Sequence, residues 1–317
     1  DWHRDRGMLY GCDHGWRGSQ VAEFGDYFRT QRWTLGPGND SPGFEPDVIR
    51  KNKVNSSIAH LYERPRVWLE GFYGTGWGTT PADLVANTVK NFVAGSNLLA
   101  LHGLYYSTHG GWWEWAPPCN FFRMPYWAHL AAYLRFSERL SYLLSQGVHR
   151  CDVAVLYPVA PVEAGLGGER AVETAFGVGE RLFGPEGRAI DFDFMDFESL
   201  DRAEIVGNEL RVAGERYRAL VLPSMAAVRF STARKALQFG RAGGLVIAVG
   251  DLPVASDRAG GDDPELDALI KEIFGVTAGE SAGVAPPITT WLPPPVPTWR
   301  PSSMNRSVVR PLACAAS

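Results

Sequence analysis

The chain has 317 residues, a formal net charge of -4, 45% hydrophobic residues and 21% charged residues. This length supports one large domain or two medium ones with a proper core. The near-neutral charge excludes a basic footprint for nucleic acid, and no apolar run is long enough to span a membrane.

Strands and helices alternate over the first 150 residues. The strongest strand is predicted at 66–70, "RVWLE", because it is rich in β-forming residues and precedes a glycine-rich loop. Other strands are predicted at 7–12, 28–36 and 96–107. Such alternation is typical of a parallel sheet with helical crossovers.

Two helices complete this first region. Thr80 is predicted to cap the first, with Pro81 at its first position and Asp83 completing a capping box. The second is predicted at 125–147, where leucines recur at helical spacing and a glycine ends the pattern.

The composition changes near 148–151, where we place a domain boundary. "CDVAVLYP" at 151–158 is a continuous buried-strand pattern. Further strands are predicted at 189–197, 217–225 and 243–253, with helices near 168–183 and 231–241. The predicted domains are therefore 1–149 and 150–284, both α/β.

The two ends of the chain differ from these domains. After Glu280 there is no acidic residue and proline is frequent, so 285–317 is predicted to be a disordered tail. A frame-shifted or artificial end is the alternative. The start, "DWHRDRGMLYG", is typical of mid-domain sequence, which favours a fragment of a longer protein.

Cysteine usage predicts no metal site. The spacing contains no CxxC pair and no histidine pattern for zinc, so the thiols are expected to be free and the compartment, cytoplasmic or secreted, stays undecided. The cysteines are Cys12, Cys119, Cys151 and Cys314.

Polar residues follow or close each of the four strands predicted in the first domain. In a parallel β/α barrel the carboxyl ends of the strands form the active face. A turn or cap role is the alternative for the aspartates, and a core role for the histidine. The residues are Asp13, His14, Asn39, Asp40, Glu70 and His102.

Glu70 is the principal candidate for catalysis. It ends an otherwise apolar run, and a carboxylate among aromatics is costly unless it is paired or solvated. This arrangement is commoner in a sugar-handling cleft than in a plain core. The alternative is a structural ion pair with Arg29, Arg32 or Arg66.

Eleven tryptophans, most in the first 130 residues, suggest platforms for sugar rings. The loop "STHGGWWEWAPP" at 107–118 would form one wall of such a cleft. An aromatic-rich core is the alternative. The predicted substrate contacts are Asp13, His14, Asp40, Trp68, Trp77, His102, Tyr105 and Trp113.

Glycoside hydrolysis requires two carboxyl groups flanking the scissile bond. Glu70 supplies one, and the second is left open among Asp13, Asp26, Asp40 and Glu114. Other chemistries are less well supported. The glycines at 164–172 lack the last glycine of a nucleotide-binding pattern, and there is no Walker A, HExxH or GxSxG motif.

Several segments resemble bacterial glycoside hydrolases of the α-L-rhamnosidase-like kind: "SSIAHLYERPRVWLEGFYGTGWG", "HGLYYSTHGG" and "YRALVLPSMAAV" with "AGGLVIAVGDLP". The resemblance implies a (β/α)8 barrel followed by a class I amidotransferase-like α/β domain. It also implies that Glu70 is the general base or nucleophile of the seventh barrel strand. The strands seen here would be the fifth to eighth, and the partner acid, on the fourth, would precede residue 1.

The same resemblance bears on cofactors and partners. No cofactor is implied, although some rhamnosidase-like relatives use calcium, for which the sequence assigns no ligand. Related bacterial β-galactosidases use the second domain to form an oligomer, so a homo-oligomer is an expectation.

The sequence thus predicts a glycosidase, or part of one, that cleaves a terminal sugar such as L-rhamnose or a galactoside. A non-catalytic carbohydrate-binding protein with the same aromatic cleft is the alternative. A third hypothesis, amidotransferase activity, is weakened because "LVIAVGDLP" has no nucleophilic cysteine.

Overall fold

The computed structural model describes residues 1–11, 16–42, 44, 47–105, 116–183 and 188–277. Residues 1–280 form one compact unit. The tail predicted at 285–317 lies outside the described residues. None of the helices described is both long and apolar enough to cross a membrane.

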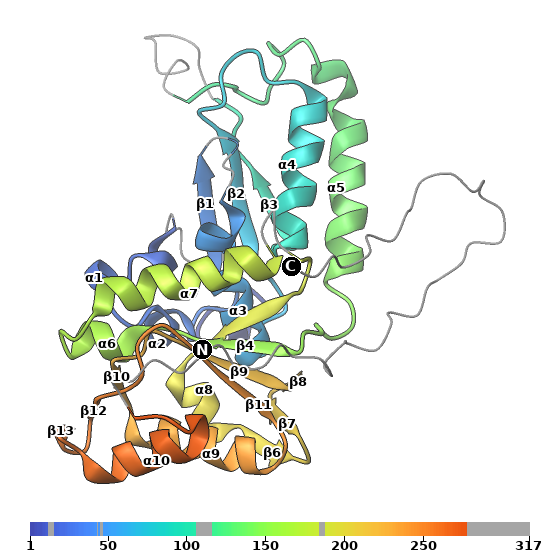
Figure 1. Cartoon of the computed structure of the whole chain (residues 1–317). Coiled ribbons are helices and arrows are strands. Elements are labelled where there is room, and N and C mark those ends of the chain that lie inside the picture. Colours follow the sequence, from blue (N-terminus) through green and yellow to red (C-terminus); the bar gives the residue numbers. More distant parts are fainter. Residues whose placement is uncertain (12–15, 43, 45–46, 106–115, 184–187, 278–317) are drawn as a thin grey trace, which may run out of the picture. The chain divides into compact units, whose positions relative to one another are not determined.

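The first sheet is parallel and consists of β1 (Gly38–Pro42), β2 (Trp68–Tyr73) and β3 (Leu98–Leu101), in that spatial order. Figure 1 shows helices α4 (Pro81–Val93) and α5 (Leu130–Leu144) side by side against it. The apolar stripes of these two helices cover one face of the sheet. They do not cover the opposite face of β2. The buried cluster on the covered face contains Leu69, Phe72, Leu84, Met124, Tyr126, Leu130 and Tyr133.

The predicted capping box of α4 is confirmed. The Thr80 hydroxyl accepts a hydrogen bond from the Asp83 backbone N–H at 3.3 Å, and the Asp83 carboxylate accepts one from the Thr80 N–H at 2.9 Å. Pro81 occupies the first helical position, where it has no N–H to leave unpaired. Local chemistry alone was sufficient to locate this helix start.

Two predicted strands are wrong. The first half of the strand predicted at 28–36 belongs instead to helix α2 (Tyr27–Gln31). Asp26 caps this helix, since its carboxylate accepts a hydrogen bond from the Arg29 N–H at 3.0 Å. Tyr27, Phe28 and Gln31 are buried, a helical spacing rather than a strand alternation. Within 7–12, Gly11 forms only an isolated parallel bridge with Gly36.

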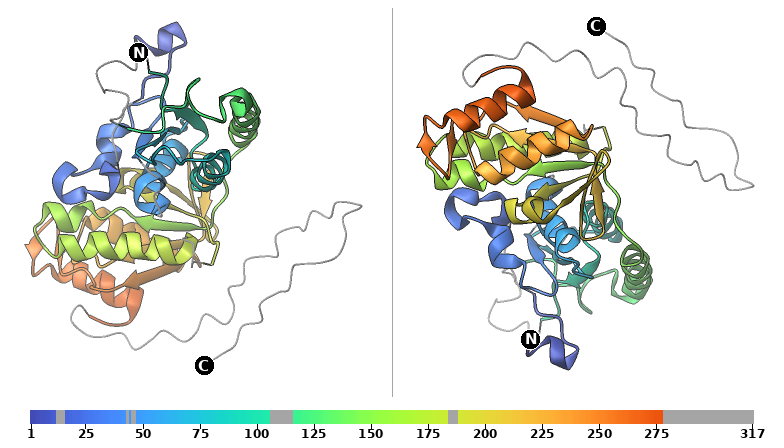
Figure 2. Two further views of the ribbon diagram at one scale, coloured as in Figure 1. Left: turned by 90° about the horizontal axis from the view of Figure 1, so that it is seen from above. Right: turned by 90° about the horizontal axis from the view of Figure 1, so that it is seen from below.

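The second sheet is parallel, with the strand order β11-β9-β4-β5, and it confirms the strands predicted at 151–158, 189–197, 217–225 and 243–253. Figure 2 shows helices on both sides of this sheet, with α7 on one side and α9 and α10 on the other. Helix α7 confirms the helix predicted near 168–183. The bounds are β4 Val153–Leu156, β5 Phe192–Met195, β9 Ala219–Pro223, β11 Leu245–Val249, α7 Gly168–Phe183, α9 Phe230–Arg241 and α10 Pro264–Phe274.

Shorter elements connect these layers. An antiparallel meander of three strands, β6, β7 and β8, lies between β5 and β9 in the chain, and three two-residue strands form a small separate sheet. Their bounds are α1 Val21–Phe24, α6 Val159–Glu163, α8 Phe197–Arg202, β6 Glu204–Val206, β7 Glu209–Val212, β8 Glu215–Tyr217, β10 Ala227–Val228, β12 Ala255–Ser256 and β13 Gly260–Gly261.

Helix α3 (Val54–Leu61) connects the two sheet regions through a shared core. Its Ile58 and Leu61 are fully buried in the same cluster as Val155 of β4 and Phe194 of β5. The buried core therefore includes residues from both sides of 148–151, where the composition changes. The division into domains 1–149 and 150–284 stays a prediction.

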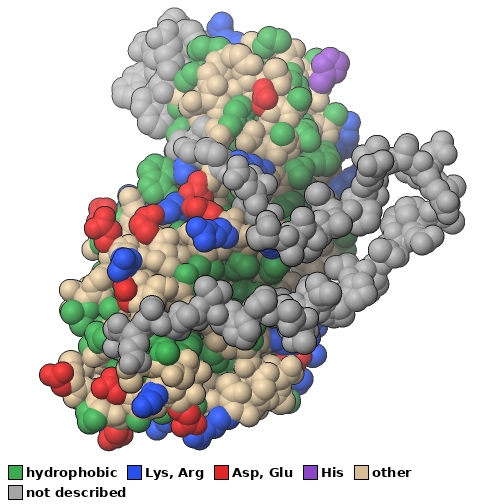
Figure 3. Space-filling model, in the orientation of Figure 1, with side chains coloured by type: hydrophobic (Ala, Val, Ile, Leu, Met, Phe, Trp, Pro, Cys, Tyr) green, Lys and Arg blue, Asp and Glu red, His purple; other side chains and the backbone are tan. Residues whose placement is uncertain are grey.

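Charged side chains of both signs are interspersed on the face that α7 covers (Figure 3). Arg50 joins this region to the π-helical turn Ile49–Lys53, because its guanidinium lies 2.8 Å from Glu173 and 3.0 Å from Glu180. The mixture of signs on the visible described residues is consistent with the small net charge.

Candidate active site

Glu70 lies on the face of the first sheet that α4 and α5 leave uncovered. In β2, Leu69 is fully buried in the helix-covered cluster, whereas Trp68 and Glu70 are half-buried on the opposite side. Alternation along the strand produces this division. The prediction that the strand ends at Glu70 is wrong, because β2 continues to Tyr73.

Asp40 is the neighbour of Glu70 across the sheet. The parallel register of β1 and β2 pairs Asp40 with Glu70, and the Tyr73 hydroxyl donates a hydrogen bond to Asp40 Oδ1. Two carboxylates therefore come from adjacent positions of neighbouring strands. The sequence anticipated Asp40 as a residue following its strand, whereas it lies within β1.

The strand predicted at 96–107 is shorter in the structure, because β3 ends at Leu101. His102 directly follows it, and its ring lies beside Tyr73 with a centroid distance of 4.7 Å. Burial lowers the pKa of His102, although the charge of Asp40 opposes this effect. Its Nδ1 atom is buried and has no hydrogen-bond partner among the described residues. The imidazole is therefore available as a neutral polar group on the Glu70 side of the molecule.

Asn120 holds the backbone at His102 in place. Its side-chain amide donates to the His102 carbonyl at 2.5 Å, and its own oxygen accepts from the Tyr126 hydroxyl at 2.7 Å. Sequence reasoning missed Asn120 and the role of Tyr73. Asn120 has no local signal, and Tyr73 was recognised only as one aromatic among several.

Trp68 packs one layer below Glu70. Its indole lies so close to Gly38 and Gly11 that a Cβ atom at either glycine would stand 2.7 Å or less from the ring. Its Nε1 is buried without a hydrogen-bond partner among the described residues. Trp68 is thus a packing residue beneath the face, and its predicted substrate contact stays a prediction.

Two further predicted contacts lie at the edge of this face. Trp77 is 42% exposed on the loop between β2 and α4, and Tyr105 stands edge-on to His102 with centroids 6.1 Å apart. An exposed indole on a loop that follows a parallel strand suits sugar stacking. Asp13, His14 and Trp113 lie outside the described residues.

The other charged candidates have structural partners. Asp26 caps α2, and its pKa is raised mainly by burial. Arg32, proposed above as an ion-pair partner of Glu70, forms a salt bridge with Glu198. Of the candidates for a second carboxylate, Asp40 is the one that the described residues place beside Glu70, since Glu114 also lies outside them.

The chain matches a family model described as alpha-L-rhamnosidase over residues 21–286. The parallel sheets and this match define the chain as part of the glycoside hydrolases. It belongs to the alpha-L-rhamnosidase family of that model. No curated protein matches the chain at a significant level.

Solved structures of glycosidases share the fold. A rhamnosidase from Novosphingobium sp. PP1Y is 23% identical, with a TM-score of 0.56, over 78% of this chain and 24% of that one. A catalytic mutant of Gan42B, a GH42 beta-galactosidase from G. stearothermophilus, is 13% identical with a TM-score of 0.56, over 85% of this chain and 39% of that one. The chain therefore spans about a quarter and two fifths of these two structures.

Proposed function

We propose that the chain contributes the C-terminal half of a (β/α)8 barrel. The support is the order of the parallel segments. The bridge at Gly11 and Gly36, then β1, β2 and β3, follow one another along the chain, and the three strands are neighbours in the same order. Helices α4 and α5 cover the outer face, and Glu70 and Trp68 lie on the face that a closed barrel would enclose.

The second sheet supports an amidotransferase-like domain without amidotransferase chemistry. Ser224 follows the central strand β9 in a left-handed turn, with φ +46°, a position where a nucleophile elbow would place its reactive side chain. Its hydroxyl donates to Asp251 at 2.8 Å instead of to a histidine. An activating histidine is therefore missing from the described hydrogen-bond partners of Ser224, and we assign this domain a structural role.

The proposed activity is hydrolysis of a terminal α-L-rhamnoside, with Glu70 as general base or nucleophile. The observation that carries it is the position of Glu70 on the uncovered sheet face, in register with Asp40, in a chain of the alpha-L-rhamnosidase family. The oxocarbenium-like transition state of glycoside hydrolysis needs a negative charge at such a position.

The partner acid is proposed to come from a preceding barrel strand, as the resemblance implies. Asp40 accepts the Tyr73 hydrogen bond, which suits a positioning role better than that of a proton donor. Carboxyl groups about 5–5.5 Å apart would give retention of configuration, and about 6.5–9.5 Å would give inversion.

The chemistry requires no organic cofactor, because water and two carboxyl groups suffice. Calcium takes six to eight oxygen ligands. The described face supplies Asp40 and Glu70 as carboxylates, which is short of that number, so no step is assigned to calcium.

The test compares Glu70→Gln with the native residue in the full-length enzyme, on nitrophenyl α-L-rhamnoside and β-galactoside. We expect turnover of the rhamnoside to fall by at least ~10³-fold, about 4 kcal/mol, while the unfolding midpoint is unchanged. Glu204→Gln, at the exposed start of β6, is the matched control and should keep full turnover. Sugar binding without any turnover by the native enzyme would instead establish the carbohydrate-binding alternative.

A further inference from the structure

A second group of ionisable side chains lies away from the Glu70 face, at the junction of helix α3 with the second sheet. His149 and Cys151 precede β4, Asp193 belongs to β5, and Glu215 is the first residue of β8. Together these four residues are called the His149 cluster. Each offers one ligand atom, and the four atoms lie within 4.8 Å of one another.

Three of the spacings among these atoms are close to the edges of a zinc tetrahedron. His149 Nδ1 lies 3.2 Å from Glu215 Oε2 and 3.4 Å from Asp193 Oδ2, and Cys151 Sγ lies 3.6 Å from the same Asp193 oxygen. Zinc bonds of about 2.0–2.1 Å to nitrogen and oxygen and about 2.3 Å to sulfur give tetrahedral edges of roughly 3.3–3.6 Å. We propose that His149, Cys151, Asp193 and Glu215 bind one Zn²⁺ ion.

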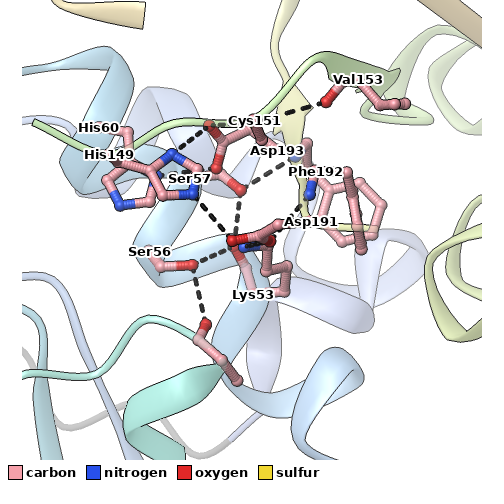
Figure 4. Close-up of polar contacts among 12 residues, drawn as sticks. Lys53, Ser56, Ser57, His60, His149, Cys151, Val153, Asp191, Phe192 and Asp193 are labelled. Atoms are coloured by element: carbon pink, nitrogen blue, oxygen red, sulfur yellow. Dashed lines mark hydrogen bonds and ion pairs between the residues drawn. The ribbon is translucent and has the colours of Figure 1, made fainter. Parts of the chain in front are cut away.

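Neighbouring groups are arranged as outer-shell partners of such a site. His149 Nε2 lies 2.9 Å from Asp191 Oδ2, so a histidine bound through Nδ1 would donate its other N–H to a carboxylate. Asp191 is held in turn by Lys53 at 2.5 Å. Figure 4 shows this chain of contacts, with the rings of His60 and His149 stacked 3.8 Å apart.

Asp193 is oriented in the same manner. The Tyr217 hydroxyl donates to its Oδ2 at 2.8 Å, and His60 Nδ1 lies 2.9 Å from its Oδ1. Asp193 is fully buried, and Glu215 is 3% exposed. Burying two carboxylates beside a third, Asp191, is costly unless they are paired. In this structure Lys53 and His149 are their partners.

The charge balance permits zinc without disturbing the rest of the network. Carboxylate oxygens lie 2.9 Å from His149 Nε2 and 3.2 Å from His149 Nδ1. Binding of Zn²⁺ would displace the proton on His149 Nδ1 and the thiol proton of Cys151. Two positive charges enter and two protons leave to solvent, so the net charge of the cluster is unchanged.

The ligand set favours zinc and a structural role. A thiolate together with imidazole selects zinc over calcium or magnesium, which prefer oxygen alone. Four protein ligands leave no open position for a substrate or water, as in closed structural sites. A groove of about 400 Å³, lined by Lys53, His60 and His149, reaches the edge of the cluster at His149.

The test uses the purified 317-residue chain, dialysed against a chelator and then titrated with Zn²⁺. We expect one zinc per chain by elemental mass spectrometry, and an unfolding midpoint that rises by several degrees on zinc addition and falls again with chelator. Co²⁺ in place of zinc should give a thiolate-to-cobalt charge-transfer band, which requires a sulfur ligand. Absence of bound zinc would overturn the proposal and leave an ion-pair network that only fastens α3 to the sheet.

Variants distinguish this site from adventitious binding. Cys151→Ser should remove the cobalt band, whereas Cys119→Ser, a buried cysteine outside the cluster, should keep it. If Cys151→Ser does not fold, Glu215→Gln and Asp191→Asn supply the test, each weakening zinc binding about 10–100-fold. Unchanged zinc affinity in both of these variants would refute the assignment.

Discussion

Gly38 of β1 lies directly against the indole of Trp68 on β2. A Cβ atom added at Gly38 would stand 2.1 Å from both Cδ1 and Nε1 of the ring. The two residues are paired in the strand register, so the tryptophan lies across its neighbouring strand. The absence of a side chain at Gly38 therefore leaves room for the Trp68 indole, which packs beneath Glu70.

Gly38→Ala is expected to destabilise the chain by about 1–3 kcal/mol, because the indole must leave its position to relieve the overlap. Urea unfolding followed by tryptophan fluorescence measures the loss. The matched control is Gly78→Ala, where an added Cβ meets nothing within 4 Å and φ is not positive. Equal stability of the two variants would contradict the proposed packing.

Tyr73→Phe removes one hydroxyl and keeps the ring beside His102. The variant loses the hydrogen bond that holds Asp40, so we expect kcat of the full-length enzyme to fall about tenfold, about 1.4 kcal/mol. Tyr142→Phe, at a tyrosine that is 67% exposed, serves as the control. A kcat equal to that of the native enzyme would show that the Tyr73 hydroxyl does not position Asp40 for catalysis.

His102 gives a pH dependence of stability whose sign follows from burial. Burial lowers the folded-state pKa of His102 below its ordinary value of 6.5, so the unfolded chain takes up its proton first on acidification. Neutral His102 makes its full contribution to the unfolding free energy above pH 6.5. This contribution is lost as the pH falls through the folded-state pKa. Urea unfolding of the native chain and of His102→Gln between pH 8 and pH 5 should show a difference that shrinks with acidification. A constant difference would be the contrary result.

The sequence located those elements whose signals are local. The capping residues of α4 and the continuous apolar pattern of β4 depend on neighbours in the chain, and both were predicted correctly. Helix α2 was missed because its Asp26 cap was weighed as a candidate catalytic carboxylate and not as a helix start. The face that carries Glu70 was predictable from alternation, whereas Tyr73 and Asn120 act through contacts with distant segments.

The cysteine prediction illustrates the same limit. The four residues of the His149 cluster are spread from residue 149 to residue 215, so the zinc site proposed above would leave no short zinc spacing in the sequence. They meet only when β4, β5 and β8 assemble. A sequence motif is recognisable when one loop or hairpin supplies several ligands. The residues of this cluster come from separate segments and therefore form no such motif.

Asn52, in the π-helical turn Ile49–Lys53, connects this turn to β1 and α4 through side-chain amides. It is fully buried, accepts from Asn39 Nδ2 at 2.9 Å and donates to Asn91 Oδ1. Asn52→Ala would leave both partners with an unmet group, at about 1–3 kcal/mol for each, and should lower the unfolding free energy accordingly. Asn208→Ala, in the exposed turn before β7, should change it by less than about 0.5 kcal/mol. If urea unfolding gave similar losses of unfolding free energy for both variants, the contribution of these amide hydrogen bonds to stability would be refuted.

The last prediction concerns the outer edge of β3, which pairs only with β2 among the described strands. Beside it lies a groove of about 670 Å³ lined by Leu98, Leu101, Leu134 and Tyr142, and Leu134 is 45% exposed. An open strand edge next to exposed apolar side chains favours association with a second copy.

We therefore expect the 317-residue chain, expressed by itself, to self-associate in sedimentation velocity experiments at micromolar concentration. Leu134→Lys places a charge in the groove and should shift the distribution toward monomer. Leu166→Lys, at a leucine that is 40% exposed elsewhere, should leave it unchanged. In the full-length enzyme the proposed barrel closes over β3, so there Leu134→Lys should lower the unfolding free energy instead of altering the oligomeric state. A monomeric native chain would contradict the open edge, and with it the proposal that these strands are half of a barrel.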